Sequence, residues 1–166
     1  MLKTEKMKFQ VIPPRPHDAV DICHVLINSI TKACGPDYQN DEKIIHNWLE
    51  NKTPENVKKW ISSSDNYSFV AIDNDGAIVG FSLMNRSGEI LLNYIEPKYM
   101  HRGIGKLFLE KFEETAKRNS IHEITVYSTI TAKDFYLRNG FLFCGEPIMI
   151  GSIVGEFPMK KCLRNL

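Results

Sequence analysis

The chain has 166 residues, with 21 basic and 20 acidic side chains and a formal net charge of +1. This length predicts one domain over residues 1–166 with a sizeable hydrophobic core. The balanced charge argues against nucleic-acid partners and a polybasic membrane anchor, and no apolar run approaches the roughly 18 residues that cross a bilayer.

The first third of the chain is predicted to be mainly helical. Residues 8–12 alternate weakly and end at Pro13-Pro14, which fits one short strand. Apolar residues then recur at helical spacing over 17–34. Two shorter helices follow, with Asp41 as the N-cap of one and Thr53-Pro54 opening the other.

Strands separated by polar, glycine-containing turns are predicted next, at 67–72, 77–84 and 89–95. The remaining predicted elements are a helix at 103–118, a strand at 121–127, a helix at 131–139, and strands at 141–144 and about 155–162. The inward stripe predicted for the first of these helices is Ile104, Leu107, Phe108, Phe112 and Thr115. Hairpins followed by β-α-β units predict an α/β (α+β) fold, in which helices cover both faces of a mixed sheet.

The cysteines indicate a reducing compartment. The four are scattered and form no Cys-x-x-Cys, and the five histidines do not fall at zinc-ligand spacing. We therefore expect reduced thiols, no metal site and a cytoplasmic location. No apolar segment follows the charged start of the chain, so no secretory signal is predicted.

The most informative segment is the basic turn His101-Arg102-Gly103-Ile104-Gly105-Lys106, between a strand and a helix. Main-chain N–H groups that converge at a helix start suit a phosphate or diphosphate. Basic side chains there oppose the helix dipole, so a bound anion explains them better than local stability does. The alternative is that they simply extend into solvent.

Two other phosphate motifs do not fit this turn. A Walker loop would need a glycine where Met100 stands and a hydroxyl where Leu107 stands. A Rossmann fingerprint would need a third glycine at Phe108. We therefore reject both a Walker-type and a Rossmann-type nucleotide site at this turn.

With these motifs the chain resembles the GNAT family of N-acetyltransferases, which use acetyl-coenzyme A (acetyl-CoA). The family's loop, Gln/Arg-x-x-Gly-x-Gly/Ala, stands here as Met100 to Gly105, with Met100 in place of the usual Gln or Arg. A second landmark, a short helix, matches at Thr129, Ala132, Phe135-Tyr136 and Gly140-Phe141, with Thr129 in place of Asn. The resemblance implies a mostly antiparallel central sheet of about six to seven strands, one acyl-CoA N-acyltransferase domain, and a homodimer as the family's frequent assembly.

The resemblance also implies where the co-substrate acetyl-CoA would bind. The loop from Met100 to Lys106 would hold the diphosphate through its main-chain N–H groups. The backbone of Tyr94 and Ile95 would bond the pantetheine arm like an added strand. Thr129 would contact the same arm in place of the family's Asn.

Transfer of acetyl to an amine needs a neutral amine, a donor for the developing oxyanion, and an acid for the departing thiolate. The Ile95 N–H is the candidate donor, and the resemblance makes Tyr136 the candidate acid. Tyr136 also fits a buried helix stripe with Ala132 and Phe135, which is the alternative.

Glu89 is the candidate base, acting through water. Strict alternation would put Glu89, Asn93 and Ile95 on one face of their strand, beside the same cleft. An exposed charge after the Ser87-Gly88 turn is the alternative for Glu89.

Asn93, Tyr38 and Trp48 are the weaker candidates for contacts with the acceptor amine. The predicted function is acetyl transfer to a primary amine of a small molecule or protein, by direct attack in a ternary complex. The alternative is an acyl-CoA-binding sensor module with little or no catalysis.

Overall fold

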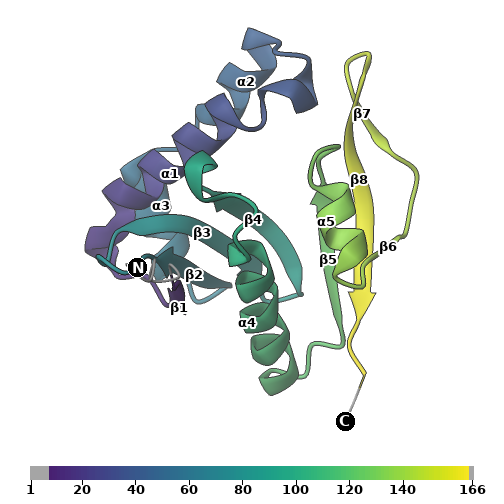
Figure 1. The fold of residues 1–166 in the computed structure, drawn as a ribbon. Helices are drawn as coiled ribbons and strands as arrows, with labels where there is room; N and C mark the ends of the chain where they lie inside the picture. Colours follow the sequence, from purple (N-terminus) through teal and green to yellow (C-terminus); the bar gives the residue numbers. More distant parts are fainter. Residues whose placement is uncertain (1–7, 165–166) are drawn as a thin grey trace, which may run out of the picture.

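The computed structural model describes residues 8–164, and its main feature is one eight-stranded sheet (Figure 1). The strand order is β1-β2-β3-β4-β5-β8-β6, and β7 pairs with β8 off this path. The strands are β1 (Gln10–Ile12), β2 (Asn66–Ile72), β3 (Ile78–Asn85), β4 (Glu89–Ile95), β5 (Glu123–Ser128), β6 (Leu142–Phe143), β7 (Ile148–Ile150) and β8 (Ile153–Cys162). The mixed, mostly antiparallel sheet is confirmed, since within residues 8–164 only β4 and β5 pair in parallel. Strand β7 was not predicted.

Helices cover both faces of the sheet, as predicted. They are α1 (Ala19–Lys32), α2 (Glu42–Leu49), α3 (Pro54–Ser62), α4 (Ile104–Arg118) and α5 (Lys133–Arg138), with single turns of 3-10 helix at η1 (Pro16–Asp18), η2 (Gly35–Tyr38) and η3 (Pro97–Tyr99). The Asp41 and Thr53 side chains cap α2 and α3 by accepting from main-chain N–H groups. None of the helices in residues 8–164 is long and apolar enough to span a membrane.

The hydrophobic core lies on both sides of the sheet. On one side, Leu83 and Leu92 pack with residues of α1 and α3. On the other, Ile90 and Val126 pack with residues of α4 and α5. Ile90 and Leu92, two positions apart on β4, therefore enter different core layers, although regular alternation would put them on one face.

Helix α4 is held by an apolar stripe that differs in part from the predicted one. Leu109 and Ala116 are buried, whereas Leu107 and Thr115, which helical spacing predicted inside, are half-buried. The observed stripe packs against Met84 and Ile124 on the sheet.

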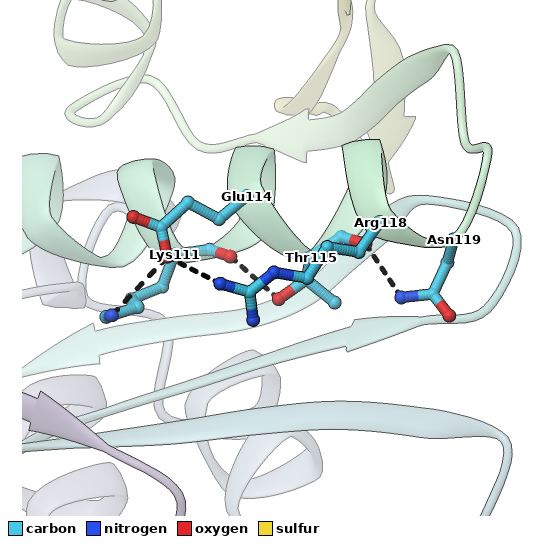
Figure 2. Close-up of polar contacts among 5 residues, drawn as sticks. All are labelled: Lys111, Glu114, Thr115, Arg118 and Asn119. Atoms are coloured by element: carbon cyan, nitrogen blue, oxygen red, sulfur yellow. Dashed lines mark hydrogen bonds and ion pairs between the residues drawn. The ribbon is translucent and has the colours of Figure 1, made fainter.

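The opposite side of α4 carries polar contacts along its second half (Figure 2). Thr115 Oγ1 donates to the carbonyl of Lys111 at 2.8 Å, and Asn119 Nδ2 donates to the carbonyl of Thr115 at 2.8 Å. Glu114 lies between Lys111 (3.4 Å) and Arg118 (4.0 Å). These contacts lie in the second half of α4 and at its C-cap Asn119, far along the helix from its glycine turn.

The sheet separates between its two central strands. The pairing of β4 with β5 is limited to Glu89 with Thr125 and Ile90 with Val126, and the strands then diverge (Figure 1). The unpaired edges of β4 and β5 face each other across the resulting gap. The site is built around this gap.

Candidate active site

A cavity of about 870 Å³ lies at the gap, lined by β4, β5, α5 and the start of α4. The predicted site residues that line it are Trp48, Asn93, Tyr94, Ile95, Met100, His101, Gly103, Ile104, Gly105, Lys106, Thr129 and Tyr136. Glu89, Arg102 and Tyr38 are not among the lining residues. Arg102 instead lies over the ring of Tyr99, with its guanidinium carbon 5.6 Å from the ring centroid.

The glycine turn presents main-chain N–H groups to the cavity. Gly103 is the N-cap of α4 with φ of 89°, a conformation that glycine adopts without strain. The first intrahelical hydrogen bond runs from the Leu107 N–H to the Gly103 carbonyl at 3.2 Å. The N–H groups of the preceding first-turn residues therefore have no partner within the helix, and the first turn holds no acidic side chain. This arrangement suits an anion.

Gly105 fits the turn for a different reason, which is space. A Cβ built on Gly105 would lie 2.9 Å from Cζ of Phe135. The glycine thus lets the Phe135 ring of α5 approach the start of α4, and both residues line the cavity.

The register of β4 decides which main-chain groups face the gap. The Glu96 N–H donates to the Val79 carbonyl at 2.8 Å, and bonded pairs alternate along an antiparallel ladder. Ile95 and Asn93 therefore direct their main-chain N–H and C=O groups away from β3 and toward the gap. Tyr94 directs its main-chain N–H and C=O groups toward β3. The main-chain bond to the pantetheine arm that was predicted for Tyr94 therefore suits Asn93 better.

Tyr136 lies in the wall of the cavity with its hydroxyl bonded to β4. Its phenol oxygen accepts a hydrogen bond from Asn93 Nδ2 at 3.1 Å. Burial raises the pKa of Tyr136 to about 12, although the bond from Asn93 lowers it in part. The phenol thus stays protonated at neutral pH. Its ring also packs in the core, 5.2 Å from the Phe141 ring, so the buried stripe position is confirmed, while the acid role stays a prediction.

Glu89 and Asn93 lie on opposite faces of the sheet, so the prediction that they share a face is wrong. Ile90 pairs with Met84, but Leu92 already pairs with Leu83, which makes Leu91 the extra residue of a bulge. The bulge breaks strict alternation. It leaves Asn93 on the α4 side and turns Glu89 to the side covered by α1.

A second carboxylate, Glu156 of β8, was not singled out from the sequence. Burial is the larger cause, and the Glu89 carboxylate the smaller, of the raised pKa of Glu156. Glu156 also acts electrostatically on Tyr38 and Tyr94, whose phenol pKa values are raised mainly by burial. Glu89 and Glu156 are therefore close enough for their charges to repel.

The remaining acceptor-side residues are held by packing. Tyr38 is 2 % exposed, and its ring lies 5.7 Å from that of Trp48. Only Trp48 of the two reaches the cavity. Thr129 Oγ1 accepts from the Ala132 N–H at 3.4 Å, so its hydroxyl supports the turn into α5.

Further residues of the cavity wall carry no motif that the sequence reveals. Lys32 and Arg138 add positive charge to the lining, which suits phosphate groups.

Burial, and then the nearby Asp37 carboxylate, raises the pKa of Cys34 to about 12. Cys34 is thus held as a thiol and not as a nucleophilic thiolate.

Comparison with known proteins identifies the class. The profile of the Acetyltransferase (GNAT) domain family matches residues 34–163. A spermidine N(1)-acetyltransferase of Thermoplasma acidophilum is 27% identical over 110 residues, which cover 60% of this chain and 68% of that protein. The crystal structure of PaiA N-acetyltransferase from Thermoplasma acidophilum in complex with coenzyme A has a TM-score of 0.80 and 25% identity, over 93% of this chain and 99% of that one. A GCN5-related N-acetyltransferase from Rhodopseudomonas palustris shares the fold, with a TM-score of 0.80 at 22% identity over 93% of this chain and 95% of that one.

The chain therefore belongs to the GNAT acetyltransferase family. It is an acetyl-CoA-dependent N-acetyltransferase, with acetyl-CoA as its co-substrate. The residues present fit this co-substrate, because the first-turn N–H groups of α4 and the open edge of β4 line one cavity.

Proposed function

We propose that the protein transfers acetyl from acetyl-CoA to a primary amine of a small cationic molecule of the polyamine type, by direct attack in a ternary complex. The observation that carries this proposal is the buried, protonated phenol of Tyr136 in the wall of the cavity that also holds the glycine turn. A phenol in that position suits protonation of a departing thiolate.

In the overall reaction the thioester C–S bond breaks and an amide C–N bond forms. The amine approaches the gap from the face covered by α1, where Glu89 takes its proton through water, and Tyr136 on the α4 face gives its proton to the sulfur. The Ile95 N–H stabilises the negative charge that develops on the carbonyl oxygen. Exchange with solvent then returns a proton to Tyr136 and removes the proton from Glu89.

Two features favour a cationic small molecule as acceptor. The similar protein from Thermoplasma acidophilum is named for spermidine. The Glu89 and Glu156 carboxylates, whose charges repel, supply negative charge, and an ammonium group beside them would relieve that repulsion. A protein amine remains the alternative acceptor.

Homodimer formation remains a prediction. We also propose a cytoplasmic location, in keeping with four free cysteines.

The test is a panel of amines incubated with acetyl-CoA and the purified protein. Polyamines, amino sugars, a lysine peptide and a peptide with a free N-terminus each serve as acceptor. Released thiol gives the rate, and mass spectrometry identifies the acetylated product. We expect the highest kcat/KM with a polyamine.

Other outcomes separate the alternatives. Turnover confined to the peptides would overturn the small-molecule assignment while leaving acetyl transfer intact. Tight binding of acetyl-CoA without turnover on any amine would favour the sensor reading. A faster reaction with propionyl- or succinyl-CoA than with acetyl-CoA would assign a different acyl donor to the protein.

A further inference from the structure

The side chain of Asn93 connects β4 to α5 through one hydrogen bond. Its Nδ2 donates to the Tyr136 hydroxyl at 3.1 Å, and the Tyr136 side chain lies in the interior, 4 % exposed. Asn93 Oδ1 is buried and has no hydrogen-bond partner among residues 8–164. A buried amide oxygen without a partner costs stability, so folding alone does not explain an asparagine at this position.

The chemistry of the phenol gives that bond a direction. A phenol has one O–H donor, and its oxygen also accepts. Because Asn93 supplies an N–H, the phenol oxygen accepts and its own hydrogen is left for another partner. A hydrogen-bond acceptor at position 93 would instead draw the O–H toward β4.

We propose that Asn93 is a positioning residue, which turns the hydroxyl hydrogen of Tyr136 toward the cavity so that the phenol donates it to the departing sulfur. This inference rests on the proposed function, because it requires Tyr136 to be the acid. Asn93 acts through Tyr136 and does not itself touch the reacting atoms. The same N–H stabilises the phenolate as the proton leaves, in line with the lowering of the Tyr136 pKa by this bond.

Two substitutions separate the direction of the bond from its presence. Asn93→Leu removes both polar atoms at similar size, and Asn93→Asp keeps the shape but presents a carboxylate that only accepts. We expect Asn93→Leu to lower kcat by about 10- to 100-fold, with the KM for acetyl-CoA changed by no more than about threefold. Its Tm should be equal to the wild type or higher, because the unpartnered oxygen is gone.

Asn93→Asp should be the slower variant at neutral pH, since an ionised carboxylate takes the phenol O–H as its own donor. As the pH falls, the carboxyl gains a proton and can donate to the phenol. The ratio of the Asn93→Asp rate to the Asn93→Leu rate should therefore rise toward acid pH. A purely structural role for Asn93 gives no such rise.

A double-mutant cycle with Tyr136→Phe completes the test, with Asn28→Leu as the matched control outside the cavity wall. We expect no further loss from Asn93→Leu once Tyr136 lacks its hydroxyl. Full activity of Asn93→Leu, or an Asn93→Asp rate above that of Asn93→Leu at every pH, overturns this inference alone. An unchanged kcat in Tyr136→Phe overturns it together with the acid role of Tyr136.

Discussion

Tyr136 is both a residue of the hydrophobic core and the proposed proton donor. Its ring packs with Phe135 and Phe141 at centroid distances of 5.1 and 5.2 Å, while its hydroxyl meets Asn93. Burial raises its pKa to about 12. The phenol therefore stays protonated across the neutral range, as the proposed acid role requires.

Tyr136→Phe removes the hydroxyl and keeps the ring, so it tests the donor alone. We expect kcat to fall by about 10²–10⁴-fold, the range of general acid catalysis, with the fold retained by circular dichroism. Tyr67→Phe is the matched control, because the Tyr67 hydroxyl contacts Arg86 at 3.5 Å and lies outside the cavity wall. Equal kcat values for the two variants would remove Tyr136 from the mechanism.

Glu156→Gln tests the carboxylate on the opposite face of the sheet. Burial and then Glu89 raise the folded pKa of Glu156 above its unfolded value. At pH values between the unfolded and the folded pKa of Glu156, the folded state therefore binds more protons than the unfolded state. The contribution of Glu156 to the free energy of unfolding falls as the pH rises through this interval. We expect Glu156→Gln to raise Tm at pH 7, with the gain vanishing below about pH 4.

Thermal unfolding across that pH range, followed by circular dichroism, measures the effect. Glu146→Gln makes the same chemical change on an exposed segment and should shift Tm less. A lower Tm for Glu156→Gln at pH 7 would show that the carboxylate stabilises the fold, contrary to this account.

At the scale of elements, one buried side chain connects η2 to the segment between β5 and α5. Asp37 of η2 is 1 % exposed and lies 94 residues from its partner in sequence. It accepts from the Thr131 N–H and from Thr131 Oγ1, both at 2.8 Å. The segment after α1 is thereby fixed to the segment that leads into α5 and Tyr136.

Asp37→Ala should lower the unfolding free energy by about 1–3 kcal/mol, because it leaves the Thr131 N–H without its partner. Asp37→Asn should lose less, since its amide oxygen can still accept from that N–H. Urea denaturation of the three proteins gives the values. Identical midpoints and slopes for Asp37→Ala and wild type would mean that this contact contributes nothing to stability.

At the scale of the whole molecule, the elements with local signals were predictable from the sequence. The glycine turn, the hairpins, the N-caps at Asp41 and Thr53, and the helix of Tyr136 each depend on residues close together in the chain. Their residue types report backbone conformation directly. The fold class followed from their order.

What the sequence could not reveal depends on pairing between distant segments. The bulge at Leu91 arises from the register with β3 and turns Glu89 to the other face, and the apolar run Ile90-Leu91-Leu92 does not show where alternation breaks. Glu156 joins Glu89 only because β8 returns beside β5. The link of Asp37 to Thr131 likewise needs the folded molecule.

The central claim is that Tyr136 faces the sulfur of a coenzyme whose diphosphate lies on the first turn of α4. A crystal structure with coenzyme A measures this directly, through the distance from the Tyr136 oxygen to that sulfur. We expect about 4 Å or less, with the diphosphate on the main-chain N–H groups between His101 and Lys106. A sulfur outside the gap between β4 and β5, or a diphosphate away from that turn, would contradict the account.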